Sequence, residues 1–237
     1  MRLRESLFCA ALMSIAFVTT NASAPTLPGE ECIPDFSVDG TSGGEAKTVA
    51  APVAPSPLIH QDKVLGSAYY ATLAILSSQN PCSDFFGGPD SVGIFNELVS
   101  RIRKDDMSVG IAMRMSGAVT NIQDAKTKKN YRLFEKVSLN SRGPFYRRKA
   151  ALWEPTVPRV GSFEPSTKEA RVLILLHELG HVMRGPDGQW LLANDGEDEG
   201  KSLANSQKIE DVCEGELSTL NKIVVTEDLG KFKKPNQ

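Results

Sequence analysis

The segment from Ser166 to His181 constrains the fold of this chain more than any other segment does. Ser166 and Glu169 have the spacing of a capping box, in which the serine caps a helix and the glutamate reaches back to the cap. Five consecutive aliphatic residues, 172–176, follow the box. A capped helix with an apolar centre belongs in a core, so the sequence predicts a buried helix that ends near residues 185–186.

Two histidines and a glutamate lie near the end of this predicted helix, in the order His177-Glu178-Leu179-Gly180-His181. Residues four apart share one face of a helix, so both imidazoles can bind one metal ion. Glu178 is rotated about 100° from His177, where it can accept a proton from a water molecule on that ion. The pattern predicts His177 and His181 as zinc ligands and Glu178 as a catalytic general base. The alternative is a buried helix with two hydrogen-bonded histidines.

The HELGH pattern resembles the active-site helix of the zincin metallopeptidases. The chain from Cys82 to Cys213 also resembles a group of exported bacterial proteins, in which HELGH precedes an Asp-Gly turn, a Ser-x-x-Asn-Ser/Thr motif and a cysteine. The matching segments here are Asp195-Gly196, Ser202-Leu203-Ala204-Asn205-Ser206 and Cys213. The resemblance implies an α+β, zincin-like fold, with a small sheet packed on the HELGH helix and a helical C-terminal part. It also implies a secreted zinc metallopeptidase, more typically an endopeptidase than an exopeptidase, acting on protein or peptide substrates.

A catalytic zinc needs a third protein ligand beside a water molecule. Resemblance to the exported proteins indicates Asp195, which we rank first. Zincins with the longer HExxHxxGxxH/D pattern would place the ligand at Asp187, although Arg184 stands where that pattern has glycine. Zincins that take a glutamate from a later helix would use Glu216, which lies nearest the apolar side among the glutamates at 210, 214 and 216.

A rival interpretation is a catalytically silent secreted protein that keeps zinc as a structural element of a zincin-like scaffold. The two interpretations differ in coordination, because a fourth tight protein ligand would close the site to water and substrate. Three other polar residues are weaker candidates for a role at the site. Asn205 is expected to be buried and to bond the loop backbone, and Tyr146 or Arg142 could stabilise an oxyanion.

Hydrophobic periodicity predicts the remaining elements. Helices are expected over residues 66–78, from Asp90-Ser91 to Ile102, and over 202–220. Two half-buried strands are expected over 109–115 and 131–139, separated by a polar turn at 124–130. The first of these strands could be an edge that pairs with an extended substrate.

The first 24 residues have the layout of a secretory signal peptide. Arg2 and Arg4 precede an apolar run at 7–18, which is too short to span a bilayer, and small residues follow at 22–24. Residues 25–63 are rich in Pro, Gly, Ala and Ser and predict a flexible leader. The zincin-like domain is therefore expected at 64–237, in a secreted or periplasmic protein without a membrane span.

Three cysteines remain after the predicted signal peptide, and an oxidising compartment favours pairing of two of them. We expect a disulfide between Cys82 and Cys213, because both lie in segments with folded character while Cys32 lies in the leader. The alternative is three unpaired thiols.

The chain carries 27 basic and 29 acidic residues, a formal net charge of −2. Binding to nucleic acid or to an anionic membrane usually requires an excess of basic residues. The overall charge therefore predicts neither kind of partner.

Overall fold

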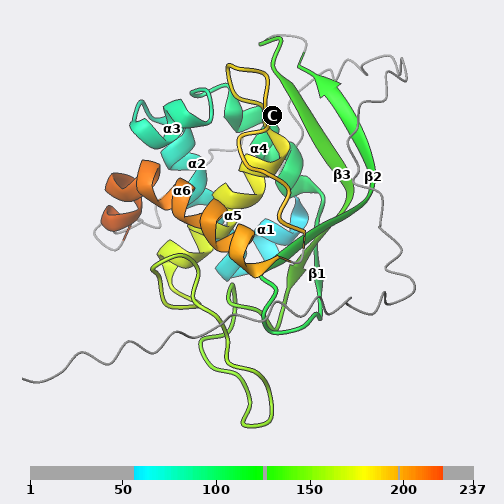
Figure 1. Ribbon diagram of the computed structural model, residues 1–237, viewed down its shortest axis with the longest axis vertical. Coiled ribbons are helices and arrows are strands. Elements are labelled where there is room, and N and C mark those ends of the chain that lie inside the picture. Colours follow the sequence, from blue (N-terminus) through cyan, green and yellow to red (C-terminus); the bar gives the residue numbers. More distant parts are fainter. Residues whose placement is uncertain (1–55, 125–126, 197, 221–237) are drawn as a thin grey trace, which may run out of the picture. The chain divides into compact units, whose positions relative to one another are not determined.

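The computed structural model describes residues 56–124, 127–196 and 198–220, and these form an α+β fold (Figure 1). The expected α+β class is confirmed, with a small sheet and several helices. The elements in chain order are α1 Pro57–Gln61, α2 Lys63–Ser77, α3 Pro81–Phe85, α4 Ser91–Ser100, β1 Ile102–Asp105, β2 Met113–Gln123, β3 Asn130–Asn140, α5 Lys168–Val182 and α6 Glu199–Thr219.

The sheet has the strand order β1-β3-β2. β3 pairs in parallel with β1 and antiparallel with β2, and the β2–β3 register shifts between Ser116 and Val119. Gly117 lies at this shift with a φ of 83°, a value that favours glycine. Of the predicted turn at 124–130, residues 124 and 127–129 lie between the two antiparallel strands, Asn130 begins β3, and residues 125–126 lie outside the described residues.

The first predicted strand begins later than expected, and β1 was not predicted. Val109 lies in a turn instead of a strand, because the Asn140 side-chain amide donates to the carbonyls of Ser108 and Ile111, at 2.7 Å each. The strand β2 starts only at Met113. Ile102, which was expected on the preceding helix, begins β1 and pairs with Val137.

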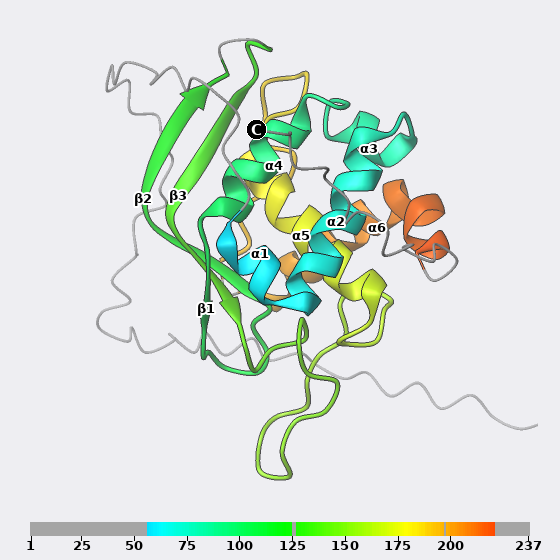
Figure 2. The same ribbon diagram turned by 180° about the vertical axis from the view of Figure 1, so that it is seen from behind.

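The helices lie on one side of the sheet (Figures 1 and 2), and α4 and α5 contact β3. α5 contacts α2, α4, α6 and β3, so it is surrounded by other elements. All five aliphatic residues at 172–176 are buried, as the sequence predicted. The helix that carries both histidines is therefore held from several directions.

Both ends of α5 differ in detail from the prediction. Thr167 caps the helix by accepting a hydrogen bond from the Ala170 amide at 3.2 Å, so the predicted Ser166 cap is wrong by one residue. Ser166 instead has a φ of 64° and donates to the carbonyl of Tyr146. The helix ends at Val182, earlier than expected, because the next residue is extended and bridges to β3.

The described structure begins inside the predicted leader of residues 25–63. The side chain of Ser56 caps α1, and that of Asp62 caps α2 by accepting from the amides of Val64 and Leu65 at 3.0 Å. Two short-range caps therefore order residues 56–63, where hydrophobic periodicity gave no signal. The predicted signal peptide, 1–24, and most of the leader lie outside the described residues. No described helix is long and apolar enough to cross a membrane.

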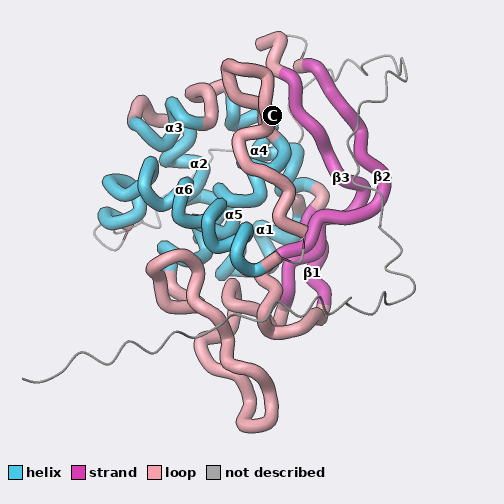
Figure 3. The backbone as a smooth tube through the Cα atoms, in the orientation of Figure 1, coloured by secondary structure: helices cyan, strands magenta, loops and turns pink. Residues whose placement is uncertain are grey.

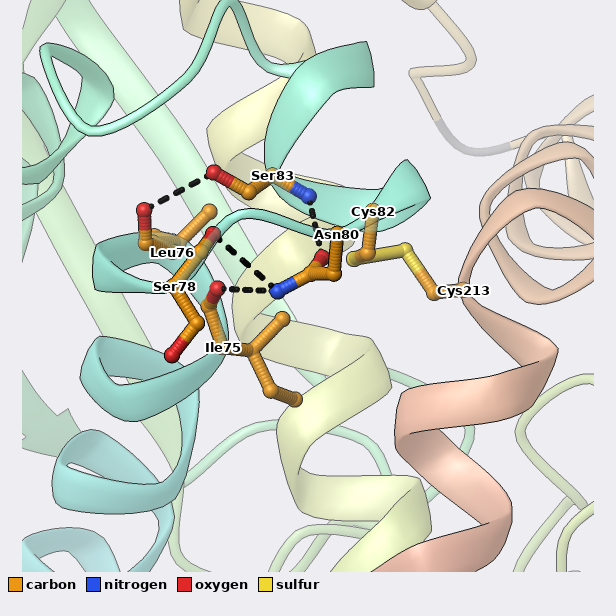
Figure 4. The surroundings of a disulfide bond; sticks show 7 residues. All are labelled: Ile75, Leu76, Ser78, Asn80, Cys82, Ser83 and Cys213. Atoms are coloured by element: carbon orange, nitrogen blue, oxygen red, sulfur yellow. Dashed lines mark hydrogen bonds between the residues drawn. A yellow bond between two sulfur atoms is a disulfide. The ribbon is translucent and has the colours of Figure 1, made fainter.

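A disulfide joins Cys82 of α3 to Cys213 of α6, across 131 residues of sequence (Figure 4). The short helix α3 is fixed by the Asn80 side chain, which accepts from the Ser83 amide at 2.7 Å and donates to the Ile75 carbonyl at 2.8 Å. The disulfide therefore ties α6 to a well-defined turn after α2. Cys32 lies outside the described residues.

Candidate metal centre

Three side chains with metal-binding atoms converge at the C-terminal half of α5. His177 and His181 come from successive turns of the helix, and Asp195 comes from the loop between α5 and α6. The two Nε2 atoms lie 3.0 Å apart. Asp195 places one carboxylate oxygen 3.0 Å from His177 Nε2 and the other 3.3 Å from His181 Nε2. These are the residues predicted as two ligands and as the first-ranked third ligand.

The spacing of these atoms can be compared with the needs of zinc. Bonds of about 2.0 to 2.1 Å at tetrahedral angles separate neighbouring donor atoms by about 3.3 Å. The observed separations of 3.0 to 3.3 Å are close to this value. Two imidazole nitrogens and a carboxylate are also a donor set that zinc favours. The residues therefore fit a zinc ion.

His177 has a second contact that bears on its tautomer. Its Nδ1 atom lies 3.0 Å from the hydroxyl oxygen of Ser206 on α6. When Nδ1 carries the proton and donates to Ser206, Nε2 presents its lone pair to the cluster. Ligating histidines in metalloproteins are commonly oriented through their other ring nitrogen in this way.

The loop that carries Asp195 is fixed to both helices. The Asn205 side chain donates to the Ala193 carbonyl at 2.9 Å and to the Asp195 carboxylate at 3.4 Å, which confirms its predicted bond to the loop backbone. The Leu192 amide donates to the Gly180 carbonyl at 3.2 Å. A Cβ atom on Gly180 would lie 2.7 Å from Leu192, so glycine in HELGH allows the loop to lie against the helix.

The pKa values of the two carboxylates at the site are shifted in opposite directions. Burial raises the pKa of Asp195, but its hydrogen bonds with His177 and His181 and their charges outweigh that effect and hold the pKa well below the usual range. Burial also raises the pKa of Glu178, and the charges of the two histidines only partly oppose that effect. Asp195 thus remains an anion beside the histidines, whereas Glu178 is shifted towards proton uptake.

The alternative third ligands lie elsewhere. Asp187 is exposed, and its carboxylate accepts from the Gln189 amide in the turn after α5. Glu216 lies ten residues beyond Ser206 on α6, which corresponds to about 15 Å along a helix. Within the described residues, the histidines therefore meet Asp195 and neither alternative.

The predicted oxyanion candidates are engaged in other contacts. The Tyr146 hydroxyl donates to Asp62 at 2.7 Å, and the Arg142 guanidinium pairs with Glu154. His60, the remaining histidine, is exposed on α1. None of these interactions involves the donor cluster.

A second group beside the cluster was missed by the sequence analysis. The Arg132 Nε atom donates to the His181 carbonyl at 2.8 Å, and its guanidinium lies 4.2 Å from the Trp190 ring centre. Arg184 flanks the same ring at 4.2 Å. Trp190 and Arg184 also line a pocket of about 340 Å³ that includes Tyr131 but none of the three donor residues. No local pattern connects these residues, because the bridge between Tyr131 and Met183 brings them together.

Comparison of the chain with models of protein families, with curated proteins and with solved structures finds no match.

Proposed function

We propose that this protein is a zinc-dependent metallopeptidase with a zincin-like fold. The observation that carries the proposal is the convergence of His177, His181 and Asp195, with Glu178 on the same helix. Among the described residues the donor group has three members. Three protein ligands are typical of catalytic zinc, which keeps a position for water, whereas structural zinc usually has four.

Each residue has a specific part in the proposed hydrolysis. His177, His181 and Asp195 would hold the ion. Zinc there would act as a Lewis acid and lower the pKa of a water molecule to about 7. Glu178 would accept a proton as the water oxygen bonds to the peptide carbonyl carbon, and would then give it to the departing amine as the C–N bond breaks. The raised pKa of Glu178 supports both transfers.

The expected edge strand is present in the sheet. In the described residues β2 pairs with β3 alone, but β3 lies between it and α5, because Tyr131 of β3 pairs with Ile122 of β2 and bridges to Met183 just after α5. The proposal of protein or peptide substrates and of an endopeptidase therefore rests on the donor cluster and not on this edge. The Cys82–Cys213 disulfide supports the accompanying proposal that the protein is exported, because disulfides persist in oxidising compartments.

One observation favours the rival function, a structural zinc in a catalytically silent protein. The side chains of His177, His181 and Asp195 are only 9%, 6% and 14% exposed. A substrate carbonyl must reach the ion, so an enzyme with this site would have to admit the peptide through a narrow opening. A structural site would need no such access.

Metal content and hydrolysis measured on the same samples distinguish these functions. We expect the purified wild type to bind about one zinc and to cleave casein. Glu178→Gln should keep the zinc but lose at least about a hundredfold in rate, because a general base contributes about 10² to 10⁴. Glu199→Gln is the matched control, since Glu199 is an exposed glutamate after the same loop, and it should behave as the wild type.

The outcomes separate the two functions. Zinc-loaded wild type without hydrolysis of casein or of a mixed peptide library would favour the structural role. A wild type that binds no zinc would reject both functions.

A further inference from the structure

The connection between β3 and α5 projects away from the helices and the sheet (Figures 1 and 3). It carries Leu152, which is fully exposed, and Trp153, which is 86% exposed. Large apolar side chains next to each other at such exposure are unusual on a folded protein. Both residues are outside the candidate metal centre, so the proposed hydrolysis does not account for them.

Local contacts hold these two side chains outward. The Glu154 amide donates to the Ala151 carbonyl at 3.0 Å, and the Ala151 amide donates to the Glu154 carboxylate at 2.8 Å. Arg142 and Arg147 also pair with this carboxylate. Leu152 and Trp153 lie between the two ends of this closed turn. We call these two residues the apolar tip.

The connection is fixed where it joins the rest of the fold. Phe145 precedes the apolar tip and is fully buried, and Val157 and Val160 follow it and are also buried. Val160 forms a bridge with Phe163. The segments before and after the turn are therefore anchored by buried residues, and the position of Leu152 and Trp153 is fixed.

Basic side chains lie immediately before the apolar tip. Residues 142–154 contain Arg142, Arg147, Arg148 and Lys149, against Glu154 as the single acid. Arg148 and Lys149 are exposed, and neither forms an ion pair with another described residue. The near-neutral charge of the whole chain conceals this local excess of positive charge.

This arrangement matches the layers of a lipid bilayer surface. Lys149 precedes Leu152 by three residues, so its charge can lie up to about 10 Å behind the apolar tip. Interfacial binding buries apolar side chains by about 5 to 10 Å while basic groups meet the lipid phosphates. Tryptophan is also enriched at this depth.

We propose that the apolar tip, with Arg148 and Lys149, attaches the protein to the surface of an anionic lipid bilayer. This revises the expectation from net charge that no anionic membrane is a partner. A protein partner fits less well, because a stable protein interface buries about 800 Å² on each side, far more than two side chains supply. Peripheral attachment to lipid combines burial of apolar side chains with attraction between basic residues and anionic lipids.

Sedimentation of the purified protein with lipid vesicles tests this proposal. We expect binding to vesicles of phosphatidylglycerol and phosphatidylcholine and little binding to phosphatidylcholine alone. Leu152→Ser and Trp153→Ser should each weaken binding about tenfold through lost apolar burial. Arg148→Gln and Lys149→Gln should each weaken it about fivefold, and high salt should remove most of that contribution.

Two controls separate the apolar tip from general effects. Leu203→Ser removes an exposed leucine on α6, which is 57% exposed, and should bind vesicles as the wild type does. Glu178→Gln should also bind normally, so attachment is measured independently of the proposed peptidase activity. In a Trp190→Phe background, Trp153 fluorescence should shift to the blue on binding.

Several outcomes would overturn the proposal. These are equal binding to neutral and anionic vesicles, no binding to either, and unchanged binding of Leu152→Ser and Trp153→Ser. Binding to soluble polyglutamate without binding to vesicles would also reject it and would favour an acidic protein partner.

Discussion

The α5–α6 region and the projecting connection differ in which side chains they bury. Between α5 and α6, polar groups are enclosed and converge. The metal-binding atoms of His177, His181 and Asp195 lie within 4.8 Å of one another. In the connection, Leu152 and Trp153 are exposed to solvent. Each region reverses the usual pattern of apolar residues inside and charged residues outside.

The difference suggests two separate tasks. Enclosed polar groups strengthen one another electrostatically and suit metal binding and chemistry, since little water competes with them. Exposed apolar groups become stabilising only when a partner covers them, so they are typical of a binding surface. Changes in one region should therefore leave the function of the other intact, and the following predictions test that independence.

The largest expected effect is loss of zinc on removal of a histidine. His177→Ala or His181→Ala leaves two of the three proposed ligands, so we expect zinc affinity to fall by at least about a hundredfold. Metal content after dialysis measures this, and vesicle binding of the same variants should be unchanged. Equal zinc content in the wild type and in both variants would reject the site.

The next effect is on stability. Cys82→Ala combined with Cys213→Ala opens a loop of 131 residues, and the chain-entropy model gives a loss of up to about 5 kcal/mol. Urea unfolding followed by circular dichroism gives the difference in the free energy of unfolding. Asn205 and Ser206 on α6 contact the loop of Asp195 and the ring of His177. The double variant should therefore bind zinc more weakly than the wild type, while its binding to vesicles changes less. A double variant as stable as the wild type would contradict this prediction.

Removing the charge of the proposed third ligand should lower zinc affinity less than removing a histidine does. Asp195→Asn preserves the volume but removes the negative charge, so zinc affinity should fall at both low and high salt. Asp187→Asn and Glu216→Gln are the matched variants and should bind zinc nearly as the wild type does. If one of these two loses zinc while Asp195→Asn retains it, the proposed assignment of the ligand is wrong.

Structural elements that depend on interactions between residues close in the sequence were the most predictable. α5 was predictable because five aliphatic residues and the four-residue spacing of His177 and His181 report directly on a buried helix. Its cap was misplaced by one residue because Ser166 and Thr167 can both cap a helix. The short strand β1 was missed because its stability depends on pairing with Val137, 35 residues later.

The surroundings of the candidate metal centre were less predictable. Asp195 was ranked first only through resemblance, since no spacing rule places a loop residue against a helix. The contact of Ser206 with His177 depends on how α6 lies across α5, and a helical pattern does not specify that angle. Net charge did not reveal the basic side chains before the apolar tip, because a sum over the chain contains no information about position.

The smallest expected effect is a pH dependence confined to the projecting connection. The Ala151 amide and the Arg142 guanidinium stabilise the charged form of Glu154 and lower its pKa from 4.5 to about 2. A lowered pKa in the fold means that this stabilisation is complete above about pH 4.5 and is lost as the pH falls towards 2. In a Trp190→Phe background, the fluorescence anisotropy of Trp153 should therefore decrease across that window, at pH values where circular dichroism is still unchanged. Glu154→Gln should show the lower anisotropy already at pH 7 and little further change on acidification. A constant anisotropy down to the pH of global unfolding would show that Glu154 does not hold the apolar tip in place.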